Sequence, residues 1–484
     1  MVDTQSDRRD LLVVGCGIAG LSAAVAARER GLSVTVLERA PVRDFGGNTR
    51  WTESYLRMKS EEAVSDDFES SLAENAGANL DPNLLLMAAG PYRDWPPFLK
   101  AHGMPDPELV STFAAEAGTI LKWLRKFGIK FGALASYLLT TSAPRLMPIG
   151  GGLALIEALH AHAMKSGVEF HYETTAHELL RDEAGAVTGV LARGAHGISR
   201  RYTARSTVLA SGGFEGNPEM LTRYIGPHAQ YIRPVAQGGY YNKGEGIRMA
   251  LAIGAAPAGD YGSYHAEPVD PRSRQAEAII MCFPYGILVN TLGQRFIDES
   301  PGAVDNNYDP ISRSFSEQPK GIVYLILDQG IHDVPNWRKS VRTDQPAIEA
   351  ATIAELAAKL GLPAGNLSAT VASYNAACRP GTFKPLEVDA LATVGLDPPK
   401  SNWARPIKLT PYLAYPIIST VCFTFGGLKV DSKARVLDGD GRPINGLFAA
   451  GETVGLYYQL YTGATSVLKG AVFGRLAGTN AAAG

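Results

Sequence analysis

Three glycines near the amino terminus, in Gly15-Cys16-Gly17-Ile18-Ala19-Gly20, follow the spacing GxGxxG. The short apolar run 10–14 before them is typical of a buried strand, and the alanine-rich residues 18–30 after them have helical periodicity. In such a unit the first glycine turns the chain, the second lets the backbone approach a pyrophosphate, and the third lets helix and strand pack. The segment therefore predicts a dinucleotide-binding βαβ unit.

A carboxylate completes this pattern. Residues 32–37 have the pattern of a second strand, and Glu38 follows them directly. A carboxylate about 20 residues after the glycines binds a ribose diol and disfavours a 2′-phosphate. The loop Gly46-Gly47-Asn48-Thr49 comes next and is able to present backbone N–H groups to an anion. FAD and NAD both satisfy these features.

Composition excludes several classes of protein. The 484 residues exceed what one hydrophobic core usually supports, and 46 basic residues nearly balance 48 acidic ones, which disfavours a nucleic-acid partner. The apolar runs are too short for a membrane span, and no export signal is visible, so we expect a soluble, cytoplasmic protein. Four scattered cysteines without a CxxC motif predict reduced thiols and no metal site.

The pattern along the chain predicts an α/β fold with two domains. We expect a discontinuous Rossmann-type FAD-binding domain from residues 1–237 and 407–484, with an inserted α+β substrate or capping domain over residues 238–406. The local elements expected from periodicity are mostly helix over 61–131, a β-meander over 168–209, helices over 353–360 and 367–377, short strands at 428–431 and 447–450, and a final helix from about Ser466.

Nine segments carry a resemblance to a known family. In chain order they read GCGIAG, LERA, GGNTR, VLASGGFEGN, PYGILVNTLGQRFIDE, NWARPIKLTPYLAYP, FTFGGLKVD, LFAAGE and FGRLAG. Over nearly its whole length the chain resembles the FAD-dependent flavoproteins of the fumarate reductase and 3-ketosteroid dehydrogenase superfamily. Within that superfamily, GGNTR and WARPI…YLAYP look most like the tricarballylate dehydrogenase branch.

The resemblance implies FAD as cofactor and a set of contact residues for it. The last helix would direct its positive end at the flavin and stabilise negative charge there. The implied FAD-binding residues are Gly15, Gly17, Ile18, Ala19, Gly20, Glu38, Arg39, Gly47, Asn48, Thr49, Ala176, Gly212, Glu452, Ser466 and Val467.

The chain departs from fumarate reductases where those enzymes hold a dicarboxylate. Ala303 stands where the proton-donating Arg is expected, Tyr461 where a carboxylate-binding Arg is expected, and Cys422 where a His is expected. Of that set His265 alone is retained. Because Arg forms planar bidentate bonds that these residues cannot replace, a fumarate reductase activity is disfavoured.

Ketone desaturases of the 3-ketosteroid type use tyrosine hydroxyls instead, one as base and one to polarise the carbonyl. By this resemblance Tyr461 is the first candidate, Tyr308 a substitute for the second, and His265 a third catalytic candidate. Tyr415 and Tyr457 are further pocket candidates. A structural role is the ordinary one for most of the 20 tyrosines, since they pack a ring and bond the hydroxyl locally.

These observations favour an enzyme that forms a C=C bond next to a carbonyl by proton abstraction and hydride transfer to flavin N5. Its substrate would be a small carbonyl compound, either a cyclic ketone or a keto acid. Its second partner would be an external electron acceptor such as oxygen, a quinone or a carrier. A tricarballylate-like carboxylate dehydrogenase and an enoate reductase are the alternatives. A flavoprotein that only relays electrons is disfavoured, since an inserted domain over the cofactor would act as a lid that excludes water from a substrate.

Overall fold

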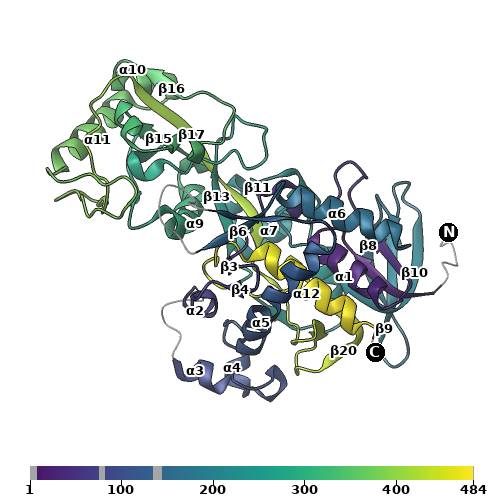
Figure 1. Cartoon of the computed structure of the whole chain (residues 1–484). Helices are drawn as coiled ribbons and strands as arrows, with labels where there is room; N and C mark the ends of the chain where they lie inside the picture. Colours follow the sequence, from purple (N-terminus) through teal and green to yellow (C-terminus); the bar gives the residue numbers. More distant parts are fainter. Residues whose placement is uncertain (1–7, 76–81, 135–143, 483–484) are drawn as a thin grey trace.

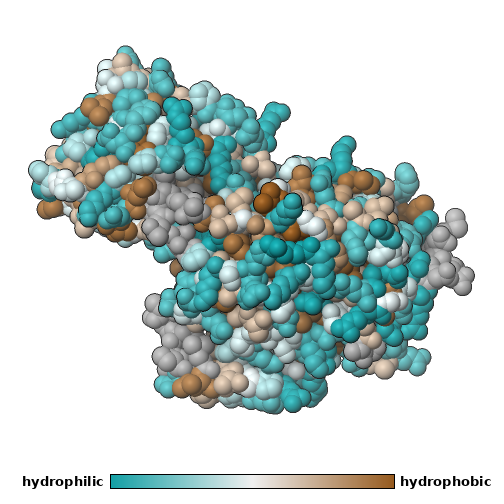
Figure 2. Space-filling model, in the orientation of Figure 1, coloured by the Kyte–Doolittle hydropathy of each residue, from teal (hydrophilic) through white to brown (hydrophobic). Residues whose placement is uncertain are grey.

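The computed structural model of the chain describes residues 8–75, 82–134 and 144–482. Figure 1 shows two main lobes, one holding both chain ends and one drawn in green from the second half of the sequence. Helices cover sheets in both lobes, which confirms the expected α/β class. Within these described residues, no helix has the length and apolarity that crossing a membrane requires. Hydrophilic side chains cover most of the face in Figure 2.

The central sheet of the larger lobe is parallel around strand β1 (Arg9–Val14). β1 pairs in parallel with β2 (Val34–Leu37) on one side and with β10 (Ser199–Leu209) on the other. Helix α1 (Ile18–Glu29) makes the crossover between β1 and β2. Residues 11–14 are buried, with α1 packed on the sheet, and this burial explains the unbroken apolar run in the sequence. The predicted βαβ unit is confirmed.

Further strands extend this sheet in the order β19-β20-β10-β1-β2-β7, and β8 and β9 continue from β10 as an antiparallel meander. The meander predicted over 168–209 is therefore confirmed. The bounds are β7 (Glu169–His171), β8 (Thr175–Arg181), β9 (Val187–Arg193), β19 (Arg435–Leu437) and β20 (Pro443–Ala449).

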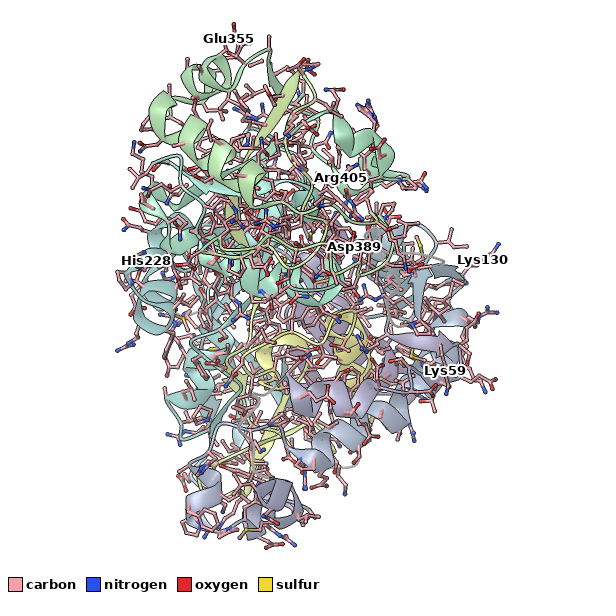
Figure 3. All side chains as sticks on the ribbon, turned by 90° about the vertical axis from the view of Figure 1, so that its left-hand side faces the viewer. Lys59, Lys130, His228, Glu355, Asp389 and Arg405 are labelled. Atoms are coloured by element: carbon pink, nitrogen blue, oxygen red, sulfur yellow. The ribbon has the colours of Figure 1, made fainter. Side chains whose placement is uncertain are left out.

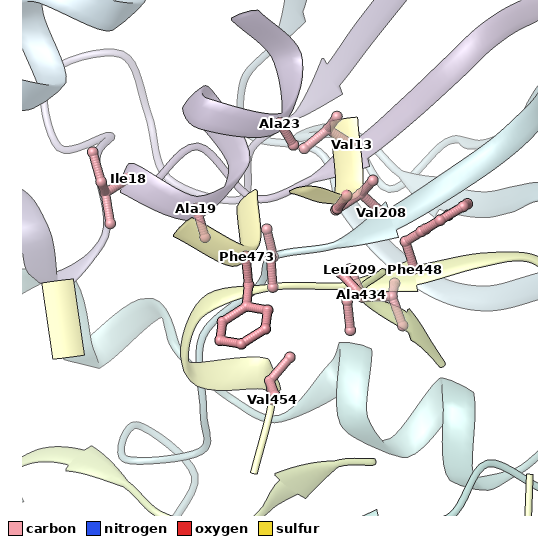
Figure 4. Packing of buried hydrophobic residues seen from close by; sticks show 14 of the residues in the cluster. Val13, Ile18, Ala19, Ala23, Val208, Leu209, Ala434, Phe448, Val454 and Phe473 are labelled. Atoms are coloured by element: carbon pink, nitrogen blue, oxygen red, sulfur yellow. The ribbon is translucent and has the colours of Figure 1, made fainter. Parts of the chain in front are cut away.

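The final helix, α12 (Ser466–Asn480), packs along α1 and joins the two ends of the chain. Gly474 and Gly478 allow this close approach. A Cβ atom at Gly474 would lie 2.3 Å from the carbonyl oxygen of Ala19, and one at Gly478 would lie 2.1 Å from that of Ala23. Figure 4 shows Ala19 close to Phe473, and Ala23 farther along, beside Val13. The larger lobe is thus built from both chain ends.

A second sheet forms the smaller lobe around the long strand β17. β17 pairs with β11, β13, β15 and β16, and β14 pairs with β15. Helices α10 and α11 lie against it, and Figure 3 shows Glu355 of α10 at the far end of this lobe. The bounds are β11 (Arg233–Pro234), β13 (Tyr264–Val269), β14 (Ile287–Asn290), β15 (Ile322–Leu327), β16 (Ile348–Ala350), β17 (Tyr412–Thr424), α10 (Ile353–Leu360) and α11 (Ala364–Ala377).

Two segments cross the domain boundaries predicted at 238 and 406. Ile247, Met249 and Ala250 belong to the hydrophobic core of the larger lobe, although they follow residue 238. Strand β17 lies beyond residue 406, yet it is the central strand of the second sheet. The division at 238 and 406 stays a prediction, and pairing and packing place the core of the inserted unit between β13 and β17.

The remaining elements confirm the helical character expected over 61–131, with α5 as its longest helix. Asp106 caps α5 by accepting a hydrogen bond from the backbone N–H of Glu108 at 3.0 Å. The bounds are β3 (Met58–Ser60), β4 (Ala63–Val64), α2 (Phe68–Glu74), α3 (Pro82–Met87), α4 (Pro97–Lys100), α5 (Pro107–Arg125), β5 (Phe131–Leu134), β6 (Arg145–Pro148), α6 (Gly151–Lys165), α7 (Pro218–Ile225), α8 (Glu245–Leu251), β12 (Pro257–Ala258), α9 (Val304–Ser314) and β18 (Gly427–Leu428).

Candidate active site

One long cavity runs from the glycine turn after β1 to the start of α12 and on to residues of β13, α9 and β17. Its walls bring together the predicted residues from both ends of the chain. Those that line it are Gly15, Gly17, Ile18, Ala19, Glu38, Arg39, Gly47, Asn48, Thr49, Ala176, Gly212, His265, Tyr308, Glu452, Tyr457, Tyr461, Ser466 and Val467.

The three glycines of the GxGxxG motif have different roles. Gly15 has φ +108°, and a Cβ atom there would lie 2.2 Å from the carbonyl oxygen of Ala210. Gly20 does not line the cavity, which corrects its prediction as a contact residue. A Cβ atom at Gly20 would lie 1.9 Å from the Gly15 carbonyl oxygen, so Gly20 serves packing. At Gly17 the nearest atom to an added Cβ is the carbonyl oxygen of Gly46 at 3.6 Å, so Gly17 faces open cavity space.

Glu38 forms part of the cavity wall at the end of β2. Its carboxylate accepts hydrogen bonds from the backbone N–H groups of Cys16 at 2.8 Å and Ala40 at 2.7 Å. Burial raises the pKa of Glu38, and these two bonds counteract the rise. Arg39 beside it forms an ion pair with Glu245 at 2.7 Å. The carboxylate is thus held in a fixed position, with lone pairs left for a ligand hydroxyl.

The Gly47 to Thr49 loop contributes a polar atom that the protein leaves unpaired. The side-chain amide of Asn48 donates to Glu215 at 2.6 Å and to the carbonyl oxygen of Cys422 at 2.8 Å. Its oxygen Oδ1 is buried and has no hydrogen-bond partner among the described residues, and neither does the Ser211 hydroxyl. Buried polar atoms are rarely left unsatisfied, so both fit contacts to a bound molecule.

The cavity wall formed by the C-terminal segment contains the start of α12 and the carboxylate of Glu452. Glu452 accepts a hydrogen bond from the Thr424 backbone N–H at 2.8 Å. Lys469 in the first turns of α12 is fully buried, and burial lowers its pKa to about 7, although Glu452 opposes the change. The positive end of α12 reaches the cavity through Ser466 and Val467.

Tyr461 is held at the start of α12 by its own hydroxyl. The hydroxyl oxygen accepts the backbone N–H groups of Thr465 at 3.0 Å and Ser466 at 3.1 Å, and the O–H donates to the Ser466 hydroxyl at 3.1 Å. The Tyr461 ring centroid lies 4.4 Å from that of His265 and 4.9 Å from that of Phe423. Accepting two N–H bonds polarises the O–H and makes it a better donor.

His265 and Tyr308 form a second pair beside Tyr461. The Tyr308 hydroxyl and Nε2 of His265 share a hydrogen bond of 2.7 Å. Burial lowers the pKa of His265 to about 3, so the imidazole is neutral. Asp309 of the same helix accepts the backbone N–H of Ala266 at 2.9 Å and of Tyr461 at 3.4 Å, which ties α9 to both walls. The structure thus brings all three catalytic candidates together. Tyr415 lies in the core of the smaller lobe and does not line the cavity, which corrects its place as a pocket candidate.

A β-bulge assembles a polar group that sequence reasoning missed. His265 pairs with Phe423 and Ala266 pairs with Val421, so Cys422 is the extra residue on β17. His265, Glu267 and Cys422 bring their polar side-chain atoms within 4.8 Å of one another. His265 bonds Tyr308, and the Cys422 thiol bonds Glu267, so we treat the group as a hydrogen-bonded cluster. The expectation of no metal site stays a prediction. The i, i+2 spacing of His265 and Glu267 was the available signal, because it puts both on one face of a strand.

Two arginines at the cavity were also missed. Arg145 at the start of β6 is 4% exposed and binds both carboxylate oxygens of Asp305, at 2.9 and 2.7 Å. Arg342 forms an ion pair with Glu53 at 2.7 Å. Neither arginine stands at Ala303, Tyr461 or Cys422, the positions where fumarate reductases are expected to carry cations, so matching those positions could not reveal them. Both are engaged by carboxylates of the protein itself.

Comparisons with known proteins agree with this cavity. The family model described as FAD binding domain matches residues 10–468. The chain is 28% identical to an NADH:acrylate oxidoreductase of Vibrio harveyi over 98% of this chain, and it spans half (50%) of that protein's length. It is 26% identical to a vinyl phenol reductase of Lactiplantibacillus plantarum, over 95% of this chain and 93% of that protein. It is 27% identical to a 4-oxocyclohexanecarboxylate 2-dehydrogenase of Sinomonas cyclohexanicum, over 97% and 92%.

Solved structures show the same fold. A flavocytochrome c3 fumarate reductase in its open conformation matches with a TM-score of 0.76 and 24% identity, over 99% of this chain and 78% of that chain. A 3-ketosteroid-Δ4-(5α)-dehydrogenase of Rhodococcus jostii RHA1 matches with a TM-score of 0.68 and 26% identity, over 99% and 98%. The open face of Gly17 and the unpaired oxygens of Asn48 and Ser211 fit the FAD that these comparisons imply.

Replacing Gly17 with Leu tests the cavity directly. The new side chain enters open cavity space, so we expect a folded protein that purifies without its yellow FAD absorbance. The visible spectrum reports the flavin and circular dichroism reports the fold. Gly20→Leu is the matched control, because its side chain meets the Gly15 carbonyl oxygen and should destabilise the fold itself. A Gly17→Leu protein with full FAD content would refute this assignment.

Proposed function

The chain belongs to the FAD-binding flavoprotein family of the fumarate reductases and 3-ketosteroid dehydrogenases, and on this premise we propose that it is a ketone desaturase. It carries FAD and is an oxidoreductase that acts at carbon–carbon bonds. When bound, FAD accepts the hydride that leaves the substrate. The proposed substrate is a cyclic ketone or keto acid, which would gain a C=C bond next to its carbonyl.

The arrangement of Tyr461 is the observation that carries this proposal. Its polarised hydroxyl lies at the cavity wall beside the positive end of α12. A substrate carbonyl oxygen there would replace the Ser466 hydroxyl as acceptor. Donors fixed where negative charge develops stabilise an enolate, and each contributes roughly 3 to 4 kcal/mol in oxyanion holes. Tyr461 would therefore acidify the C–H bond next to the carbonyl.

Tyr308 and His265 have a supporting role in this proposal. To act as a base, the Tyr308 hydroxyl would first have to give its own proton to His265, its hydrogen-bond partner. Burial lowers the pKa of His265 to about 3, so the imidazole is a poor proton acceptor. The pair instead packs against the Tyr461 ring and keeps it in position. This revises the sequence-based assignment of Tyr308 as a second catalytic hydroxyl.

The charge pattern favours a ketone over a dicarboxylate. Arg145 and Arg342 are bound by Asp305 and Glu53, so binding a substrate carboxylate would require these pairs to open. A neutral carbonyl needs no such change. The tricarballylate-like carboxylate dehydrogenase thus remains the weaker alternative within this proposal.

The reverse reaction is the second candidate function. The acrylate oxidoreductase and the vinyl phenol reductase are named as reductases, whereas the 4-oxocyclohexanecarboxylate enzyme is named as a dehydrogenase. The same residues serve an enoate reductase, because a donor that stabilises an enolate does so in both directions. We place the protein in the cytoplasm, with residues 238–406 as a cap over the flavin and an external electron acceptor.

Anaerobic mixing with a substrate panel tests the reaction class. Cyclohexanone and 4-oxocyclohexanecarboxylate represent ketones, and succinate and tricarballylate represent carboxylates. We expect at least one ketone to bleach the visible absorbance of the oxidised flavin. Succinate should leave it unchanged, because the cavity arginines are already paired. Bleaching by succinate, or steady reduction of fumarate by a reduced dye, would contradict the proposal.

Tyr461→Phe separates a catalytic from a structural hydroxyl. The change removes one oxygen and keeps the ring contacts with His265 and Phe423. We expect flavin reduction by the reactive ketone to slow on the order of a hundredfold with FAD content unchanged. Rapid-mixing absorbance gives the rate, and Tyr457→Phe is the control, since its hydroxyl bonds the hydroxyl of Thr465, the residue just before α12. A normal rate with a lowered melting temperature would mean that the Tyr461 hydroxyl only caps the start of α12 and has no catalytic role.

A further inference from the structure

We propose that Glu267 is the catalytic residue that takes the proton from the carbon beside the substrate carbonyl and returns it in the reverse reaction. The inference rests on the proposed function, because it names the proton acceptor of that same reaction. It stands on the position of Glu267 in the cavity wall, on its unpaired oxygen and on the bulge that arranges its neighbours.

Glu267 is a buried carboxyl at the cavity wall. It lies two residues after His265 on β13, is 8% exposed and lines the cavity that holds Tyr461. Its oxygen Oε2 is buried and has no hydrogen-bond partner among the described residues. A buried carboxyl oxygen without a partner is costly for the fold alone, and such costs are characteristic of functional sites.

The surroundings of Glu267 keep both the protonated and the ionised form of its carboxyl populated near neutral pH. Burial, with contributions from Glu277 and Glu53, raises the pKa of Glu267 to about 8, although Arg342 and the bond from Cys422 oppose the rise. A base works best when its pKa lies near the working pH. Glu277 responds to the same neighbours, and burial raises its pKa to about 7.

The other titratable groups at this wall are less suited to the role. Burial lowers the pKa of His265 to about 3, and burial raises the pKa of the Cys422 thiol well above its usual range. Burial raises the pKa of Asp309 to about 6, but its oxygens already accept the backbone N–H groups of Ala266 and Tyr461 and pair with Arg313. Glu267 alone among these four keeps a carboxyl oxygen unpaired in the described chain.

The proposed step balances with the cofactor of the family. The C–H bond beside the carbonyl breaks, its proton bonds to Oε2 of Glu267, and its electron pair forms the new C=C bond. FAD, when bound, would supply the acceptor for the hydride that leaves the next carbon. The substrate is oxidised by two electrons, FAD is reduced by two, and the proton on Glu267 leaves to solvent before the next turnover.

Glu267→Gln in the holoenzyme tests the proposal, with Glu277→Gln and Tyr308→Phe as matched controls. The probe is the ketone that bleaches the wild-type flavin fastest. We expect Glu267→Gln to slow bleaching at least about a hundredfold with normal FAD content, and each control to slow it less than about tenfold. In the wild type the rate should rise as the pH passes about 8 and level off above it, since the base must be ionised, and Glu267→Gln should lose this rise.

Infrared titration of the holoenzyme gives a readout that needs no substrate. A protonated carboxyl band that disappears as the pH passes about 8 should be present in the wild type and absent from Glu267→Gln. If that variant does not fold, Glu267→Asp keeps the carboxyl and should keep both the band and the pH-dependent rise with a reduced rate. A Glu267→Gln rate near wild type, or loss of the pH-dependent rise in Tyr308→Phe instead, would overturn the proposal. If no ketone bleaches the wild type, the proposed function fails, and absence of the band would separately refute Glu267 as the titrating group.

Discussion

The contact between α1 and α12 is the feature on which the rest of the site depends. The two helices come from opposite ends of the chain, and Gly474 and Gly478 let them approach backbone to backbone. Through this contact the glycine turn at Gly15 and the helix start at Ser466 become two walls of one cavity. The start of α1 and the start of α12 would therefore both hold a bound FAD, since the positive end of a helix stabilises negative groups.

Pairing of charges inside the cavity determines what kind of substrate the site suits. The guanidinium group of Arg145 is held by Asp305, and burial keeps His265 neutral. Binding energy must then come from hydrogen bonds and apolar contact, as for the proposed ketone beside Tyr461 and Phe423, whose rings pack against each other. The same dry wall raises the pKa of Glu267, so one physical effect, burial, both disfavours anionic substrates and produces a proton acceptor.

The sequence predicted the features that local patterns encode. The βαβ unit and the helix 353–360 follow from glycine spacing and apolar periodicity, which act over a few turns of chain. The cluster around Glu267 was predictable only in part: the spacing of His265 and Glu267 puts both on one face of a strand, but Cys422 joins them through a bulge between strands more than a hundred residues apart. Gly20 was misjudged because motif spacing does not distinguish a packing glycine from a contact glycine, and β17 because a strand's partners are not visible in its own residues.

The central claim is that a hydride and a proton leave adjacent carbons of a carbonyl substrate. Its most direct test is anaerobic flavin reduction by cyclohexanone labelled with deuterium either beside the carbonyl or at the next carbon, with NMR of the product. The account predicts a slower bleaching for each label, 2-cyclohexenone as product, and release to solvent only of the label beside the carbonyl. Bleaching without an isotope effect at the second carbon, or a product without a new C=C bond, would contradict it.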